Sequence, residues 1–177
     1  MNVIFLDIDG VLNGYNPRVD LFWSVLRKLH IKNIICRFYD RMGIRFFKLI
    51  LLKILIKKTN AKIVLSSSLR RQWILPYEQC GSTIKSLKRK CKILNINIFD
   101  ITPKLYGFDR GDEIKEWLKT NNVKNFVIFD DELFNFDKYY KNNLILTSKD
   151  GIIKGLSSED TGLKIKHIIK AIKLLSN

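Results

Sequence analysis

The sequence predicts an α/β domain in which a mainly parallel sheet of about five strands carries helices on both faces. Short runs of bulky apolar residues alternate along the chain with longer segments of helical periodicity. Such runs are typical of strands buried on both faces. Acidic or hydroxyl residues directly follow the runs that end at Leu6, Leu65 and Phe129. Since the carboxyl ends of parallel strands meet at one edge of a sheet, we expect these polar residues to line one ligand site.

The N-terminal half of the chain predicts two buried strands separated by a helical region. Asn2–Leu6 is the first strand and is expected at the centre of the sheet. The residues at 13–17 form a loop, and the pattern over 20–58 is helical with two breaks. Lys62–Leu65 is the second strand.

The C-terminal half continues the alternation of helices and strands. An exposed basic helix is expected first, followed by a weakly alternating third strand. The expected elements are a helix at 78–92, a strand at 96–99, a helix at 112–121, strands at 125–129 and Leu144–Leu146, and a final helix at 160–175.

The composition indicates a folded domain with a polyanionic partner. A chain of 177 residues with 46% apolar residues and eleven Phe is long and apolar enough for one core. Its 32 basic and 17 acidic residues give a formal charge of +15. That excess favours nucleic acid, an anionic membrane or a phosphorylated substrate. The abundance of Ile, Lys and Asn also fits an AT-rich genome, which raises the lysine content whatever the function.

Cysteines and apolar segments give an expectation for the compartment. Cys36, Cys80 and Cys91 are odd in number and lack CxxC spacing, so neither a disulfide framework nor a zinc site is supported. The chain starts without the basic residues and long apolar run of a secretory signal. The apolar stretch at 46–56 is too short to span a bilayer and predicts a buried helix, with a membrane or dimer contact as the alternative. We expect a cytoplasmic protein without a membrane partner.

The acidic residues after the first strand suit phosphoryl chemistry. Asp7 and Asp9 are separated by one residue, and Gly10 allows the backbone to turn sharply after them. One carboxylate can attack an electrophile while the other handles a proton. Close carboxylates repel unless a cation lies between them, and Asp130 and Asp131 add to the negative charge. Hard oxygen ligands of this kind favour Mg²⁺, which a phosphate would need in order to approach.

Two further groups are needed to bind the phosphate. Ser66, at the end of the second strand, can bind phosphate through its hydroxyl and neighbouring amides. A basic residue must neutralise charge in the transition state, and Arg110, Lys104 and Lys115 are the candidates. Arginine suits the role because its planar fork binds phosphate oxygens in pairs.

Three motifs in this order resemble those of the haloacid dehalogenase (HAD) superfamily of phosphohydrolases. They are Asp-Ile-Asp-Gly-Val-Leu-Asn at 7–13, Ile-Val-Leu-Ser at 63–66 and Val-Ile-Phe-Asp-Asp at 127–131. The chain is most similar to the HAD domains of RNA-repair proteins, which are related to the phosphatase half of polynucleotide kinase-phosphatases. That branch also has three serines followed by Trp-Arg, and here Leu69 stands in place of the tryptophan. Its remaining motifs are matched by Thr102-Pro103, by Arg-Gly-Asp-Glu-Ile at 110–114 before Trp-Leu, and by Gly155-Leu156.

The resemblance implies a role for each matched residue. Asp7 is the expected nucleophile, which forms an aspartyl-phosphate. Asp9 is the expected general acid toward the leaving alcohol and then the base that activates water. Ser66 is expected to bind the transferring phosphoryl group. Arg110 is expected where most superfamily members use lysine.

The resemblance also implies a Mg²⁺ site and further substrate contacts. Asp130 is expected to hold the ion with Asp7 and the backbone carbonyl of Asp9, and Asp131 to assist. Arg70 is expected either on a solvated face or at a substrate phosphate. The expected substrate-binding residues are Ser67, Arg70 and Gly10, and the expected metal residues are Asp7, Asp9, Asp130 and Asp131.

The chain is expected to be one Rossmann-like HAD domain of three layers over 1–177. The segment at 14–44 has little match in this branch and lies where many HAD proteins insert a cap, so we expect a small helical cap there. Its basic and aromatic residues interleave, as in proteins that grip single-stranded nucleic acid. Packing of these aromatics in the core is the alternative.

These expectations combine into one preferred function and two alternatives. The preferred function is a Mg²⁺-dependent phosphomonoesterase that acts through an aspartyl-phosphate and removes a terminal phosphate from RNA or DNA. The first alternative is a phosphatase for nucleotides or other small phosphomonoesters. The second is a non-catalytic nucleic-acid-binding module on a HAD scaffold. No G-x-x-x-x-G-K-[ST] motif is present, so no kinase half is expected.

Overall fold

The computed structural model describes residues 1–13, 43–148 and 162–176. Apart from Gly43 and Ile44, the cap expected at 14–44 lies outside these residues, as does the Gly155-Leu156 motif. Within the described ranges, no helix has both the length and the apolar character needed to cross a membrane.

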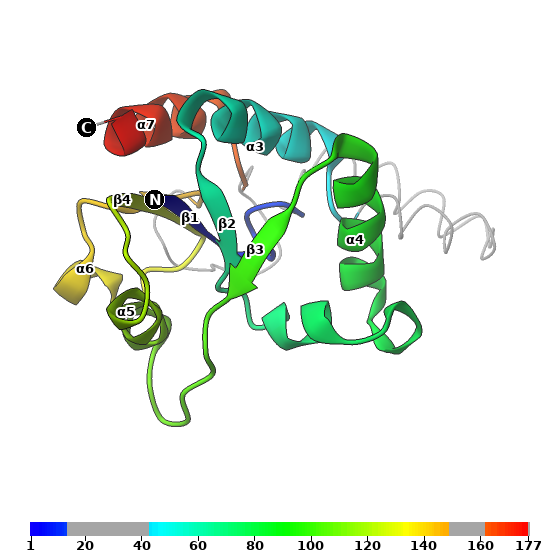
Figure 1. The fold of residues 1–177 in the computed structure, drawn as a ribbon, viewed down its shortest axis with the longest axis horizontal. Coiled ribbons are helices and arrows are strands. Elements are labelled where there is room, and N and C mark those ends of the chain that lie inside the picture. Colours follow the sequence, from blue (N-terminus) through cyan, green and yellow to red (C-terminus); the bar gives the residue numbers. More distant parts are fainter. Residues whose placement is uncertain (14–42, 149–161, 177) are drawn as a thin grey trace, which may run out of the picture.

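The sheet is five-stranded and parallel, with the strand order β3-β2-β1-β4-β5 (Figure 1). The central position of β1 confirms the prediction, and Val3 to Leu6 are fully buried because helices cover both faces of the sheet. The strands are β1 (Asn2–Leu6), β2 (Lys62–Leu65), β3 (Ile98–Ile101), β4 (Asn125–Asp130) and β5 (Leu144–Leu146).

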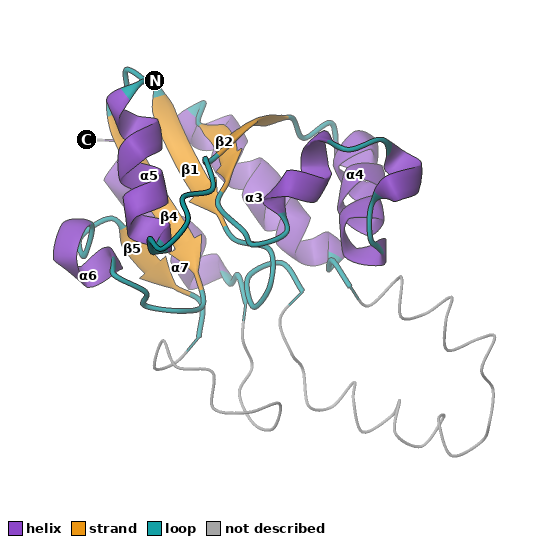
Figure 2. Cartoon of the chain, turned by 90° about the horizontal axis from the view of Figure 1, so that it is seen from below, coloured by secondary structure: helices purple, strands orange, loops and turns teal. Residues whose placement is uncertain are grey.

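Helices cover both faces of the sheet, so the domain has the three layers expected of a Rossmann-like α/β fold (Figures 1 and 2). On one face α3 and α7 lie side by side, and α4 packs next to α3. The opposite face is covered by α5 and α6. The helices are α3 (Phe46–Thr59), α4 (Ser82–Leu94), α5 (Arg110–Lys119), α6 (Phe136–Tyr139) and α7 (Ile165–Ser176).

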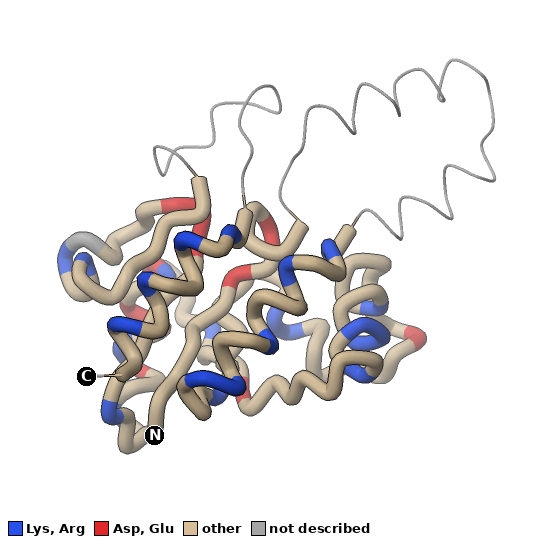
Figure 3. Tube along the Cα trace, turned by 90° about the horizontal axis from the view of Figure 1, so that it is seen from above, with Lys and Arg blue, Asp and Glu red and all other residues tan. Residues whose placement is uncertain are grey.

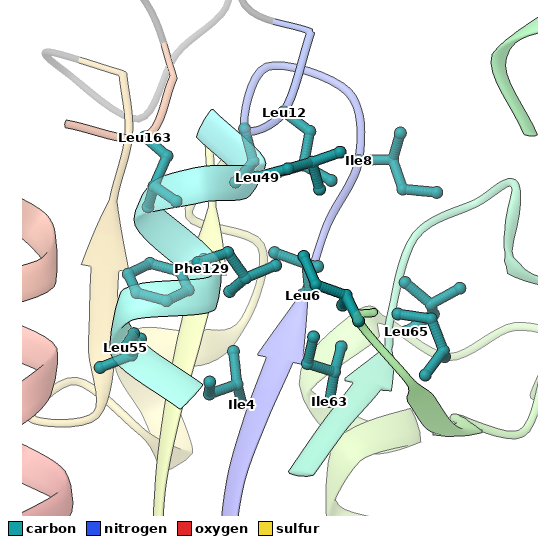
Figure 4. Packing of buried hydrophobic residues seen from close by; sticks show 14 of the residues in the cluster. Ile4, Leu6, Ile8, Leu12, Leu49, Leu55, Ile63, Leu65, Phe129 and Leu163 are labelled. Atoms are coloured by element: carbon teal, nitrogen blue, oxygen red, sulfur yellow. The ribbon is translucent and has the colours of Figure 1, made fainter. Parts of the chain in front are cut away.

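The larger core lies between the sheet and the layer of α3 and α7. Figure 4 shows Leu49 of α3 beside Leu12 and Leu55 of α3 beside Phe129 of β4, in the same cluster as Leu6 of β1. All of these side chains are fully buried. Each such side chain contributes about 1.5–3 kcal/mol of burial free energy, which holds α3 against the paired strands β1 and β4.

The smaller core is aromatic and fixes α5 against the other face. The ring of Phe5 lies edge-on to Trp117, with ring centroids 5.4 Å apart, and edge-on to Phe126 at 5.8 Å. The indole Nε1 of Trp117 donates a hydrogen bond to Asp100 Oδ2 at 2.7 Å. The first residue of α5, Arg110, is thereby held near the carboxyl edge of the sheet.

Three predicted elements begin later along the chain than expected. The final helix, expected at 160–175, begins at Ile165. The third strand starts at Ile98 because Asn95 takes a left-handed conformation and Ile96 N donates to Cys91 O at 2.9 Å, so Ile96 still belongs to the helix end. The preceding helix starts at Ser82, after two short 3₁₀ turns at Arg70–Ile74 and Tyr77–Gln79. That helix is basic, but its inner face, including Ile84 and Leu87, is buried.

The prediction of an entirely buried helix at 46–56 is wrong in part. Leu49, Leu52 and Leu55 face the core, but Phe47 is 59% exposed and Ile54 is 43% exposed. The reason is that α3 lies in the outer layer and nothing among the described residues covers its far side. Lysines also lie along α3 and α7 in this layer (Figure 3).

Candidate active site

The carboxyl ends of β1, β2 and β4 bring the predicted polar residues together. Leu6 is in register with Leu65 of β2 and with Phe129 of β4. The backbone N–H of Asp7 donates to Phe129 O, and that of Ser66 donates to Leu6 O, each at 3.0 Å. Asp7, Ser66 and Asp130 therefore leave the sheet at neighbouring points of one edge.

Three carboxylates form a compact cluster at this edge. Asp7, Asp130 and Asp131 each offer an oxygen, and these oxygens all lie within 4.8 Å of one another. Asp7 is 2% exposed and Asp130 is fully buried. A set of hard oxygen donors at this spacing is the kind of site that Mg²⁺ prefers. The cluster therefore fits a divalent cation.

Burial and mutual repulsion keep protons on this cluster when no cation is present. The pKa of Asp7 is raised from 3.8 to about 8. Burial is the largest cause; the charge of Arg110 opposes it, and the charges of Asp130, Asp131 and Asp9 add to it. Burial also raises the pKa of Asp130, and it raises that of Asp131 to about 6. A bound cation would replace the protons, because metal ligands must be deprotonated.

Arg110 is the basic residue that the fold brings to the carboxylates. Its Nη1 lies 2.9 Å from Asp7 Oδ1 and 2.6 Å from Asp130 Oδ2. It is the first residue of α5, and the helix begins there because Asp109 and Asp112 form a capping box. Burial opposes the charged guanidinium, but Asp130 and Asp7 outweigh it, so the pKa of Arg110 is raised.

The other two basic candidates lie against aromatic rings. Lys104 Nζ is 5.8 Å from the centre of the Tyr106 ring, and Lys115 Nζ is 4.7 Å from that of Tyr139. Of the three candidates that the sequence left open, Arg110 is the one that the structure pairs with the carboxylates.

The two serines after β2 differ in what their hydroxyls do. Ser66 is fully buried, and its Oγ has no hydrogen-bond partner among the described residues. Ser67 is also fully buried, but its Oγ accepts a hydrogen bond from Leu69 N at 3.3 Å. A buried hydroxyl without a partner is costly, so Ser66 is the one placed to bind a ligand.

Asp9 and Gly10 lie in a tight turn after β1. Asp9 is exposed, and its Oδ1 accepts a hydrogen bond from Asn13 Nδ2 at 2.6 Å, so its side chain lies outside the cluster of the other three carboxylates. The metal contact expected of Asp9 is through its backbone carbonyl, and it stays a prediction. Gly10 has a φ of +65°, and a Cβ there would lie 1.9 Å from Asp131 Oδ2. The structure gives Gly10 the role of making room for Asp131.

Arg70 is not on a solvated face, which corrects one of the two expectations for it. It is 4% exposed, and its Nη2 lies 2.6 Å from Glu113 Oε1. The guanidinium also donates to the carbonyls of Ser67, Thr102 and Pro103 at 2.8–2.9 Å. With its nitrogens engaged in this way, Arg70 is built into the loops, and its contact with a substrate phosphate stays a prediction.

Several residues of the site had no role in the sequence analysis. Thr147 Oγ1 donates to Gly10 O at 3.0 Å, and Ser148 Oγ donates to Asp131 O at 2.5 Å, so the end of β5 braces the acidic turns. Their signal was visible, because they follow an apolar run just as Ser66 does. The ring of Phe134 lies 4.4 Å from Arg110 Cζ, and no sequence pattern indicates that contact.

This combination of sheet and site defines a HAD-type domain, a member of a superfamily of hydrolases and phosphatases. A family model described as the HAD domain in Swiss Army Knife RNA repair proteins matches residues 3–161, and the chain belongs to that family. Searches of curated proteins and of solved structures found no match. The resemblance drawn from the sequence motifs is therefore confirmed at the level of the family and the fold.

Proposed function

We propose that the protein is a Mg²⁺-dependent phosphomonoesterase that removes a terminal phosphate from nucleic acid through an aspartyl-phosphate on Asp7. One observation carries the proposal: Asp7, at the end of the central strand, lies within reach of both Arg110 and the carboxylates of Asp130 and Asp131. Nucleophile, counter-charge and metal ligands thus occupy one edge of the sheet.

In the first half-reaction, an oxygen of the Asp7 carboxylate attacks phosphorus and forms the acyl phosphate bond. The ester P–O bond breaks, and Asp9 gives its proton to the leaving oxygen. Asp9 suits this role because it is exposed, held by Asn13, and outside the carboxylate cluster. The hydroxyl of Ser66 and the guanidinium of Arg110 bind the non-bridging oxygens, where negative charge is concentrated.

In the second half-reaction, water hydrolyses the aspartyl-phosphate. Asp9, now deprotonated, takes a proton from the attacking water as its oxygen bonds to phosphorus. The bond between phosphorus and the Asp7 oxygen breaks, which releases inorganic phosphate and restores both carboxyl groups to their starting states. Arg110 holds the Asp7 carboxylate as a leaving group through its contact at 2.9 Å.

Mg²⁺, when bound, neutralises phosphate charge and so allows an anionic substrate to approach an acidic site. Asp7, Asp130 and Asp131 would hold it, and the resemblance adds the backbone carbonyl of Asp9. The fit rests on the donor set and on Gly10, whose missing side chain leaves space for the Asp131 carboxylate.

Two features support nucleic acid as the substrate class. The family is that of HAD domains in RNA-repair proteins, and the formal charge of +15 favours a polyanion. A nucleotide or another small phosphomonoester is the second candidate, because the same carboxylate and arginine chemistry acts on any phosphate ester. Asp7, Asp9 and Asp130 are all present, which argues against a non-catalytic module.

The test is phosphate release with and without Mg²⁺ from four kinds of substrate. They are a 3′-phosphorylated oligonucleotide, its 5′-phosphorylated counterpart, a panel of nucleoside monophosphates, and p-nitrophenyl phosphate. We expect Mg²⁺-dependent release from one oligonucleotide end that is abolished in Asp7→Asn. Release from the small esters alone would reject nucleic acid as the substrate. No release from any of the four would reject the proposal that the protein is a phosphatase.

A further inference from the structure

Two large aromatic side chains are exposed on the loop between β3 and α5, next to the proposed catalytic arginine. Tyr106 is 80% exposed and Phe108 is 64% exposed. Phe108 precedes Arg110 by two residues, and Figure 1 shows the loop projecting from the body of the domain before it enters α5. The loop therefore leads from the carboxyl end of β3 to Arg110, at the edge of the sheet where Asp7 lies.

The loop is held firmly at its base, so the exposure of its rings is not the result of a loose segment. Arg70 Nε donates to Thr102 O at 2.9 Å, and its Nη2 donates to Pro103 O at 2.8 Å. Glu113, the ion-pair partner of Arg70, accepts a hydrogen bond from Leu105 N at 3.2 Å. The capping box at the start of α5 fixes the other end.

Phe134 adds a third ring on the β4 side of the same arginine. Its ring centre lies 4.4 Å from Arg110 Cζ, and its side chain is 37% exposed. Its φ is +41°, a conformation that is costly for a bulky residue. Strained backbone of this kind persists where surrounding structure enforces it, often at functional sites.

Two of the three rings of this aromatic rim, which we define as Tyr106, Phe108 and Phe134, have a cation beside them. Lys104 Nζ lies 5.8 Å from the Tyr106 ring, and Arg110 contacts Phe134. Aromatic faces that accept bases, set beside cations that accept phosphates, are the combination by which proteins bind single-stranded nucleic acid. In a duplex the bases behind the terminal pair are stacked on both faces, so they offer no free face to such rings.

We propose that the aromatic rim binds the unpaired bases next to the terminal phosphate, so that the substrate is a single-stranded end. This inference rests on the proposed function and deepens it by naming the form of nucleic acid and the residues that select it. Because every base has a flat face, the rim stacks on bases of any identity, and the protein selects strandedness more than sequence.

The test compares a phosphorylated single-stranded oligonucleotide, the same strand in a blunt duplex, and p-nitrophenyl phosphate. The variant is Tyr106→Ala combined with Phe108→Ala; Phe134 is left unchanged because its ring contacts Arg110. The matched control is Phe99→Ala, since Phe99 is 42% exposed and has Lys62 Nζ 4.0 Å from its ring centre. Lys62 is the first residue of β2, so this contact lies at the end of the strand opposite Ser66.

We expect the wild type to prefer the single strand to the duplex. In the double variant, kcat/KM for the single strand should fall at least about fivefold relative to p-nitrophenyl phosphate, and the preference should disappear. Phe99→Ala should keep the wild-type ratio. If the wild type cleaves the oligonucleotide but the double variant keeps that ratio, the inference is wrong. If the wild type cleaves no oligonucleotide, the proposed function fails first.

A binding measurement keeps the inference testable if the double variant turns over too slowly. In an Asp7→Asn background, which should bind substrate without cleaving it, affinity for the single-stranded oligonucleotide is compared with and without the two alanine substitutions. A loss of at least about fivefold supports the rim, and equal affinity overturns it. Thermal unfolding of each variant checks that these exposed substitutions leave the fold intact.

Discussion

A single nitrogen of Arg110 bridges the carboxylates of Asp7 and Asp130, at 2.9 Å and 2.6 Å. One end of α5 thus supplies positive charge between the end of the central strand and the end of its neighbour. Because guanidinium remains charged at all ordinary pH values, this charge is present whether or not the carboxylates carry protons. Arg110 therefore links the proposed nucleophile to the proposed metal site.

Arg110→Ala is expected to lower kcat about 10²–10³-fold, because a charge that stabilises the transition state is removed from a largely buried site. Steady-state kinetics with p-nitrophenyl phosphate measure the loss. Lys115→Ala is the matched control, since Lys115 lies against Tyr139 and should change kcat little. A larger loss in the lysine variant than in the arginine variant would reassign the catalytic cation.

Asp7→Asn should abolish phosphate release yet stabilise the metal-free protein at pH 8. The pKa of Asp7 is raised from 3.8 to about 8, chiefly by burial, so the folded state binds this proton more tightly than the unfolded state does. The contribution of this bound proton to the stability of the folded state is complete below pH 4 and is lost as the pH rises through 8. We expect the variant to be more stable than the wild type at pH 8 by at least about 1 kcal/mol.

Thermal unfolding at pH 5 and pH 8, with and without Mg²⁺, tests this expectation. Mg²⁺ should raise the melting temperature of the wild type at pH 8 and much less at pH 5, since Asp7 and Asp131 must lose their protons to bind it. An equal response of Asp7→Asn and the wild type to Mg²⁺ would show that Asp7 is not a metal ligand.

The strand ends could be predicted from the sequence because each of them is a local pattern. An apolar run followed by Asp7, Ser66 or Asp130 needs no knowledge of distant residues, and the parallel topology then gathers these residues at one edge. Arg110 could be predicted for a different reason: it lies in a motif that the chain shares with the family.

Arg70 and Phe134 could not be placed from the sequence, because their environments depend on distant or strained segments. Arg70 is buried by Glu113, which lies 43 positions further along the chain, and by carbonyls beyond β3. The contact of Phe134 with Arg110 depends on a backbone φ of +41°, which propensities for an aromatic residue do not indicate. The exposed outer side of α3 likewise depends on which layer the helix joins.

Gly10→Ala should weaken Mg²⁺ binding at least about tenfold, a loss typical of disturbing the surroundings of a metal ligand. A Cβ at this position would lie 1.9 Å from Asp131 Oδ2, so the carboxylate must move away from the cluster. Isothermal titration calorimetry measures the affinity. Gly107→Ala is the control, because Gly107 also has a positive φ, +76°, but a Cβ there meets nothing within 4 Å. Equal affinity in both variants would remove the role assigned to Gly10.

Arg70→Ala should destabilise the fold by about 3–5 kcal/mol, because it leaves the Glu113 carboxylate buried without its partner. Chemical denaturation measures the change, and Arg71→Ala provides the control, since Arg71 is the exposed neighbour. A substrate-binding arginine would behave differently: its loss would raise KM and leave the unfolding transition in place. A raised KM with an unchanged unfolding transition would support the prediction that Arg70 contacts a substrate phosphate.

His167 should make the protein sensitive to acid through the start of α7. The residue is 7% exposed, and its Nδ1 accepts a hydrogen bond from Lys164 N at 3.2 Å, which requires the neutral ring. The pKa of His167 is lowered from 6.5 to about 4, chiefly by burial and in smaller part by the charges of the nearby lysines at 48, 164, 166 and 170. Below pH 6.5 His167 therefore binds a proton in the unfolded state, whereas in the folded state it stays neutral down to about pH 4. The folded state loses stability over this range.

His167→Gln removes this titration and keeps the cap, because a glutamine at the third helical position can still accept the hydrogen bond of the capping residue. Between pH 7 and pH 4 the wild type should lose about 2 kcal/mol more unfolding free energy than the variant. Urea unfolding at several pH values measures the difference, which should be absent above pH 7. If the unfolding free energies of the two proteins change with pH in parallel down to pH 4, His167 binds its proton equally well in the folded and unfolded states, and the prediction is wrong.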